Sequence, residues 1–145
     1  MNETLPFPSL TDLLPHRDAM LLLDAVLAVD EKHAVTAAVV KASWPAAEAA
    51  GVPSLLCVEL TAQTIGVYNI WGLMRAHGEN VKKNGWLVAV KRAVFHADTL
   101  PFGTELTIRA ENSFSFHPFC EATGSVHWRD KLVAEVVAQI YQDEG

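Results

Sequence analysis

One stretch of the chain constrains the fold more than any other. Residues 54–77 form a helical pattern that is apolar on nearly every side. A helix on a protein surface keeps a polar side, whereas one that is apolar all round is buried. The stretch therefore predicts a buried helix around which the rest of the chain is arranged. Its apolar residues are Leu55, Leu56, Val58, Leu60, Ile65, Val67, Ile70, Trp71 and Leu73.

Both ends of this helix carry signals in the sequence. Pro53 and Ser54 predict its start, because a serine side chain can accept a hydrogen bond from an unpaired N–H group of the first turn. Gly78 predicts its end, since glycine readily adopts the left-handed conformation that closes a helix. Gly66 and Gly72 lie inside the helix, where each costs up to about 1 kcal/mol relative to alanine. We therefore expect another backbone to approach closely at these two glycines.

Six runs of apolar and β-branched residues predict strands, two before the helix and four after it. The first two are predicted to form a hairpin around Asp30-Glu31-Lys32, and the last two a hairpin around Arg129-Asp130. Residues 9–14 predict one helical turn, and residues 42–53 predict a loop. The strand runs cover residues 20–30, 33–42, 86–96, 104–113, 121–128 and 131–142.

The order of these elements predicts an α+β fold in a single domain, residues 1–145. Short connections between the long strands favour one antiparallel sheet, curled round the central helix. One sheet covers only one side of that helix, so its remaining apolar residues need a second chain. We therefore expect a homodimer or a heterodimer with a related chain.

Composition excludes several classes of function. The net charge of −6 argues against general nucleic-acid binding, which needs a clustered positive field. Cys57 and Cys120 show no zinc or disulfide spacing, which predicts buried free thiols. Glu59 and other polar residues interrupt the apolar stretch, which argues against a membrane span. The first residues do not resemble a signal peptide, so a cytoplasmic protein is expected.

Glu59 is the residue that most suggests chemistry. It lies in the first turns of the apolar helix, and Gln63 follows one turn later on the same face. Burial is expected to raise the pKa of the Glu59 carboxyl, which suits a general acid. A salt bridge or a position at a dimer seam would explain the same carboxylate without catalysis. The six histidines show no metal-ligand spacing, so no metal site is expected.

Two further features lie near this carboxylate in the sequence or in the expected fold. The N–H groups of Ser54, Leu55 and Leu56 at the helix start could polarise a carbonyl oxygen, or they could simply belong to an ordinary helix cap. His16 follows Pro15, which fixes the backbone before it, and an Arg and an Asp come next. His16 is either a base held by its neighbours or a cap on the N-terminal turn.

Three motifs resemble the 3-hydroxyacyl-carrier-protein dehydratases of the FabZ type. The sequence L-P-H-R at residues 14–17, followed by M-L-L-L-D at 20–24, is similar to their opening motif. Residues 53–66, P-S-L-L-C-V-E-L-T-A-Q-T-I-G, resemble their central helix, and L-P-F-G-T at 100–104 resembles a later turn. The helix most resembles the ApeP-like dehydratases of aryl-polyene clusters.

The resemblance implies the hotdog fold, a long helix wrapped by an antiparallel sheet. It also implies dehydration of a carrier-bound 3-hydroxyacyl thioester to the trans-2-enoyl thioester, in fatty-acid, aryl-polyene or related biosynthesis, without a cofactor. Glu59 carries over as the acid and His16 is the candidate base. Ser54, Leu55 and Gln63 are the expected substrate-binding residues, and the partner is an acyl carrier protein with a phosphopantetheine-linked substrate.

The chain departs from the FabZ pattern at one point. Residues 42–53, where those enzymes carry a histidine in an H-F-P-G segment, contain none. Two alternatives therefore stay open. One is an acyl thioesterase, since hotdog thioesterases also use a helix carboxylate, and the other is a non-catalytic subunit of a heterodimeric dehydratase.

An acidic carrier protein would need a local basic surface on this acidic chain. Five of the eleven Lys and Arg residues cluster around the helix end and the following strand. They predict a docking patch, although charges on a solvated loop and at a helix C-terminus would give the same pattern. The patch consists of Arg75, Lys82, Lys83, Lys91 and Arg92.

Overall fold

The computed structural model describes residues 9–10, 14, 20–78, 84–116 and 118–143. One long helix, α2 (Leu56–His77), follows three strands and precedes five more. Within the described residues, no helix is long and apolar enough to cross a membrane. The strands are β1 (Ala25–Val29), β2 (His33–Val39), β3 (Gly51–Pro53), β4 (Asn84–Phe95), β5 (Thr99–Pro101), β6 (Glu105–Phe116), β7 (Phe119–Trp128) and β8 (Lys131–Asp143).

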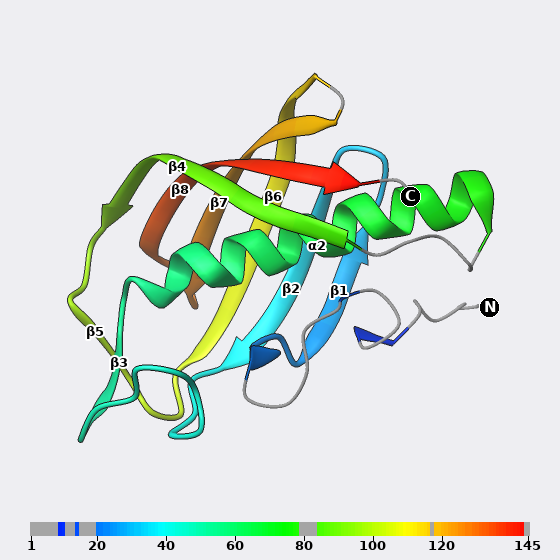
Figure 1. Cartoon of the computed structure of the whole chain (residues 1–145). Helices are drawn as coiled ribbons and strands as arrows, with labels where there is room; N and C mark the ends of the chain where they lie inside the picture. The colour runs from blue at the N-terminus through cyan, green and yellow to red at the C-terminus, as the bar shows by residue number, and fades with distance from the viewer. Residues whose placement is uncertain (1–8, 11–13, 15–19, 79–83, 117, 144–145) are drawn as a thin grey trace.

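Six of these strands form one sheet in the order β1-β2-β6-β7-β8-β4, and every neighbouring pair is antiparallel. The sheet curves around α2, which crosses its concave side (Figure 1). The predicted α+β arrangement of a helix wrapped by an antiparallel sheet is confirmed, and so are both hairpins. The sequence reading missed a second sheet, in which β3 and β5 pair beside the start of the helix.

Helix α2 is buried along its first part and emerges along its last part. Its fully buried residues run from Cys57 to Ile70, and Arg75, Ala76 and His77 are exposed. The helix ends as predicted at Gly78, whose φ of 91° lies in the region that favours glycine. The predicted burial thus holds for the part of the helix that carries Glu59 and Gln63.

The start of α2 differs from the prediction. The helix begins at Leu56, its N-cap is Leu55, and no side chain caps it. Ser54 instead extends the β3–β5 pairing, because its N–H donates to the Asp98 carbonyl at 3.0 Å. The Ser54 carbonyl in turn accepts a hydrogen bond from the Cys57 N–H at 2.9 Å. The backbone of Ser54, rather than its hydroxyl, therefore joins the small sheet to the helix.

The close approaches to α2 also differ from the prediction. A Cβ added at Gly72 would have no heavy atom within 4 Å, so the expectation of a nearby backbone there is wrong. A Cβ at Gly66 would lie 2.8 Å from Leu14 Cδ2, so a side chain occupies that space. The tight contact is made by Gly124 of β7, where an added Cβ would collide with Thr61. The glycine that brings helix and sheet together thus belongs to the sheet.

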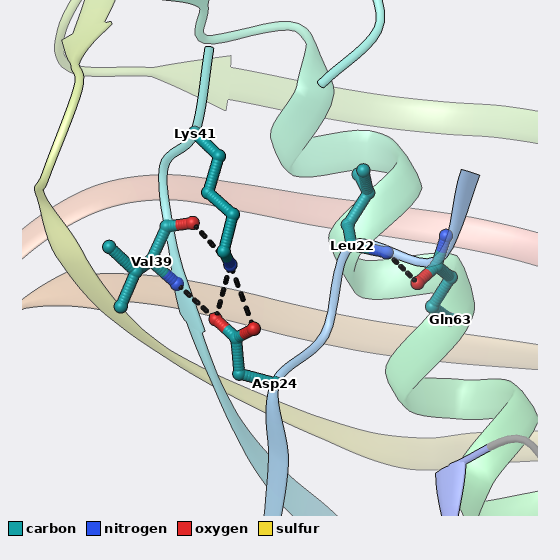
Figure 2. A network of polar contacts seen from close by, with 5 residues as sticks. All are labelled: Leu22, Asp24, Val39, Lys41 and Gln63. Atoms are coloured by element: carbon teal, nitrogen blue, oxygen red, sulfur yellow. Dashed lines mark hydrogen bonds and ion pairs between the residues drawn. The ribbon is translucent and has the colours of Figure 1, made fainter. Parts of the chain in front are cut away.

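Strand β1 is shorter than predicted, and the residues before it are held by side chains. Residues 21–24 are not in a strand. Asp24 accepts a hydrogen bond from the Val39 N–H at 2.7 Å and binds the Lys41 ammonium at 2.7 Å (Figure 2). These contacts tie the approach to β1 to the end of β2, while Leu22 and Leu23 enter the core.

Candidate active site

Glu59 and Gln63 form a hydrogen-bonded pair on α2. Gln63 Nε2 donates to Glu59 Oε2 at 2.9 Å. One turn of helix separates the two residues, so both side chains leave the same face. Gln63 is completely buried, with 0% of its surface exposed, whereas Glu59 is partly buried. A carboxylate is thus held at the edge of the core by an amide inside it.

The amide of Gln63 is also bonded to the segment before β1. Its Oε1 accepts from the Leu22 N–H at 3.0 Å, and its Nε2 donates to the Met20 carbonyl at 2.7 Å. Figure 2 shows the hydrogen bond between Leu22, in the segment before β1, and Gln63 on α2. These partners fix which end of the amide is oxygen, because each bond joins a donor to an acceptor.

The bonds of Gln63 define its role in this structure. Both of its N–H hydrogens are engaged, one with Met20 and one with Glu59. It therefore orients the carboxyl of Glu59 and ties that carboxyl to the segment that precedes β1. Direct contact between Gln63 and substrate, which the sequence suggested, would compete with these bonds and stays a prediction.

His16 lies outside the described residues, but residues on both sides of it contact α2. Leu14 is buried and its side chain lies against Gly66. Met20 is bound through its carbonyl to Gln63. Leu14 and Met20 therefore both contact α2 within about one helical turn of the Glu59–Gln63 pair.

The helix start provides part of the predicted carbonyl-binding group. The N–H of Ser54 is occupied by Asp98, so this group is not available to a substrate oxygen. Within the described part of the chain, the N–H groups of Leu55 and Leu56 have no backbone acceptor. Ser54 is therefore not an N–H donor to a substrate, and the N–H groups of the N-cap Leu55 and of the first helical residue Leu56 remain.

The predicted docking patch is only partly described, since Lys82 and Lys83 lie outside the described residues. Arg75 lies 3.8 Å from Glu31 and stacks over Trp71, beside the β1–β2 hairpin. Lys91 is paired with Glu121 of β7 at 2.7 Å, and Arg92 is exposed on β4. Arg75 and Lys91 pair with carboxylates of different elements, and the docking patch stays a prediction.

The two cysteines and two of the described histidines, His33 and His96, have structural surroundings. Both cysteines are free and buried, as predicted, and burial raises the pKa of the Cys57 thiol to about 12. His33 binds Asp30 at 3.1 Å and His96 lies 3.7 Å from Glu135. Among the described residues, no three His, Cys, Asp or Glu side chains gather as a metal site would require.

Comparisons with known proteins decide the family. The model of the ApeP-like family, described as ApeP dehydratase, matches residues 8–144. The chain belongs to the ApeP-like family. No curated protein is similar enough in sequence to count as a match. The motifs around His16 and Glu59 both lie inside the matched range, as the resemblance in the sequence implied.

Solved structures confirm the hotdog fold. The dehydratase heterocomplex ApeI:P from Xenorhabdus doucetiae is similar with a TM-score of 0.83 and 21% identity, over 97% of this chain and 93% of that one. An HP0420 homologue from Helicobacter felis gives 0.68 and 14%, over 90% and 98%. A hypothetical thioesterase with coenzyme A from Streptococcus pneumoniae gives 0.61 and 12%, over 82% and 84%. At these identities the likeness shows the fold alone.

Proposed function

We propose that this protein dehydrates a 3-hydroxyacyl thioester, held on a carrier protein in the cytoplasm, to the trans-2-enoyl thioester. The observation that carries the proposal is the Glu59–Gln63 pair, which lies within the range matched by the dehydratase family. A carboxyl held at the edge of an apolar core is placed to exchange a proton with a substrate hydroxyl.

The reaction needs one base, one acid and a group that stabilises developing charge. In this proposal His16 removes the proton from C2, and the electron pair forms the C2–C3 double bond. Glu59 protonates the hydroxyl at C3, which leaves as water. The N–H groups of Leu55 and Leu56 hold the thioester oxygen, whose negative charge grows as the C2 proton departs. The step balances without a cofactor.

The chain on both sides of His16 supports its assignment. Met20 is four positions after His16, so the Cα atoms of the two residues lie at most about 14 Å apart even in an extended chain. Met20 is bound to Gln63, and Gln63 is bound to Glu59. An imidazole within this reach is compatible with a substrate lying between a base and the Glu59 carboxyl.

A heterodimeric dehydratase in which this chain lacks its own base is the second candidate. Residues 42–53 hold no histidine, and the similar ApeI:P structure is a heterocomplex. Strand β4 forms one edge of the sheet, and it exposes Leu87, Val88 and Val90. An exposed apolar edge strand favours pairing with a second chain, either another copy or a related hotdog subunit.

The carrier protein is the proposed substrate partner, and the predicted docking patch is its proposed contact surface. Lys82→Glu with Lys83→Glu should weaken turnover of a carrier-bound substrate and spare a small thioester. An acyl thioesterase is less well supported, because the thioesterase among the similar structures shows only a shared fold.

One assay separates these functions. The purified chain, alone and mixed with a related hotdog subunit, is incubated with 3-hydroxyacyl and acyl thioesters. Enoyl-thioester formation by the chain alone supports the proposal, and formation only in the mixture supports the heterodimer. Release of thiol from the acyl thioester would instead show a thioesterase.

The same assay tests His16. If His16 is the base, His16→Ala should lower the dehydration rate by about 10²-fold or more. If it caps the N-terminal turn, the variant should lose about 1 kcal/mol of stability and keep its rate. Near-normal turnover by a folded His16→Ala protein would end its assignment as the base.

A further inference from the structure

A pocket of about 490 Å³ lies between the turn after β5 and the turn that joins β7 to β8. Neither Glu59 nor Gln63 lines it. Its volume is in the range of small-ligand sites. Leu100, Phe102 and Trp128 provide apolar parts of its lining. We call this site the Trp128 pocket.

The charges of the Trp128 pocket run against those of the whole protein. The chain carries a net charge of −6, yet all of the ionisable residues that line the pocket are basic: His96, Arg129 and Lys131. His96 lies 3.7 Å from Glu135. In the described part of the chain, Arg129 and Lys131 make no ion pair with a carboxylate, and both are exposed. Two cations are therefore available to a ligand.

The backbone of Arg129 adds an independent observation. Its φ of 56° lies in the left-handed region, where glycine fits best and a side chain is strained. The guanidinium lies 5.5 Å from the centre of the Trp128 ring. A strained residue that keeps a long cationic side chain at a pocket is a reason to suspect a ligand. Asp130, the other residue of this turn, does not line the pocket.

The pocket is also connected to the candidate active site. Strand β5 supplies part of its lining and pairs with β3, with Leu100 opposite Val52. The chain then passes from β3 through Ser54, which is bonded to Asp98, into the start of α2. A ligand in this pocket thus lies against the strand pair that positions the N-terminus of the catalytic helix.

We propose that the Trp128 pocket binds the phosphate-bearing pantetheine arm through which carrier proteins and coenzyme A hold acyl groups. This inference rests on the proposed function, since it assumes a thioester substrate. The arm combines an anionic phosphate with a long and partly apolar chain. Arg129 and Lys131 bind the phosphate, because charge-assisted hydrogen bonds to phosphate are strong. Trp128 and Phe102 contact the partly apolar pantetheine part of the arm.

Binding calorimetry with three probes tests the inference. Phosphopantetheine and coenzyme A carry the phosphate, whereas pantetheine lacks it. Arg129→Gly with Lys131→Ala removes both cations, and glycine fits the left-handed turn. The matched control, Arg109→Ala with Lys32→Ala, removes two exposed cations that do not line the pocket. Lys131→Ala alone is a second variant, in case the double variant does not fold.

The expected result is a loss of affinity limited to phosphate-bearing probes. The double variant should bind phosphopantetheine and coenzyme A at least about tenfold more weakly, and Lys131→Ala several-fold more weakly. Pantetheine binding and the control should be unchanged. Equal binding of phosphopantetheine by wild type and variant would overturn the inference. So would binding of coenzyme A without binding of phosphopantetheine, because the nucleotide would then be the ligand.

Dehydration of a short N-acetylcysteamine thioester, which has no phosphate, separates this inference from the proposed function. The pocket variant should keep wild-type activity on it. If the pocket variant loses phosphopantetheine affinity but neither wild type nor variant dehydrates the thioester, the pocket still binds the arm and the dehydratase function is rejected. Dehydration with unchanged phosphopantetheine affinity would do the reverse.

Discussion

The surroundings of Gln63 and the Trp128 pocket differ in how their polar groups are paired. The amide of Gln63 is fully buried, and its three hydrogen bonds stay within the chain. Arg129 and Lys131 are exposed and lack carboxylate partners among the described residues. A buried polar group must be satisfied by the fold itself, because leaving it unpaired costs free energy. An exposed cation is hydrated by water and needs no partner in the chain. The bonds of Gln63 therefore hold Glu59 in a fixed position, whereas Arg129 and Lys131 can bind an anionic ligand.

The largest effect should come from the carboxyl that the Gln63 amide orients. Glu59→Gln keeps the shape and can still accept the hydrogen bond from Gln63, so the fold should survive. It removes the acid, and a positioned acid or base contributes about 10²–10⁴-fold. Initial rates of enoyl-thioester formation should fall by at least the lower figure. A folded variant with more than a tenth of wild-type activity would contradict the role of Glu59.

The next largest effect should come from removing the amide itself. Gln63→Met fills a similar volume but leaves the Leu22 N–H and the Met20 carbonyl without their partner. We expect the free energy of unfolding to fall by about 2 kcal/mol or more, since an unsatisfied buried group costs about 1–3 kcal/mol. Urea denaturation measures this change.

Gln139, a partly buried glutamine on β8, provides the control for that measurement. Gln139→Met should change stability by less than about 1 kcal/mol, because the Gln139 side chain has no hydrogen-bond partner among the described residues to leave unpaired. If Gln63→Met and Gln139→Met lowered the free energy of unfolding equally, the hydrogen bonds of Gln63 would not have the structural importance assigned to them.

A smaller effect should come from the strained turn at the open pocket. Arg129→Gly and Arg129→Ala remove the same guanidinium, but only glycine relieves the left-handed backbone. The glycine variant should be more stable than the alanine variant by about 1 kcal/mol. Thermal melting in parallel checks this difference. An alanine variant as stable as the glycine variant would show that the turn is not strained.

The smallest effect near neutral pH should come from the buried thiol of Cys57. Burial raises its pKa from 9.0 to about 12, so the folded state holds the proton more tightly than the unfolded state. The stability it contributes is fully present below about pH 9 and is lost as pH rises toward 12. Between about pH 8 and about pH 10 the unfolding free energy of wild type should fall more steeply than that of Cys57→Ala. Parallel slopes would contradict this linkage.

The sequence predicted the elements whose patterns are strong and local. The apolar stretch of α2, the stop at Gly78 and the two hairpins depend on residue types that favour one conformation. The pairing of Glu59 with Gln63 also follows from helical spacing alone. The hotdog fold was implied by the matching motifs, and the similar solved structures confirm it.

What the sequence did not predict depends on contacts between distant segments. The bonds of Gln63 to Met20 and Leu22 cross 41 to 43 residues of chain, and no local pattern announces them. The short pairing of β3 with β5 occupies the N–H of Ser54, which the helix-start pattern left free. The Trp128 pocket had one weak signal, a two-residue turn without glycine at Arg129-Asp130.

The contact between Gly124 and Thr61 couples the position of α2 to strand β7. Thr61 lies between Glu59 and Gln63 in sequence, and an α-helix moves as a stiff rod. A single methyl group at Gly124 would push the helix away from the sheet, because the Thr61 side chain already fills the space. The carboxyl of Glu59 would then be displaced by a change on the opposite strand. The position of the Glu59 carboxyl thus depends on the absence of one carbon atom in the sheet.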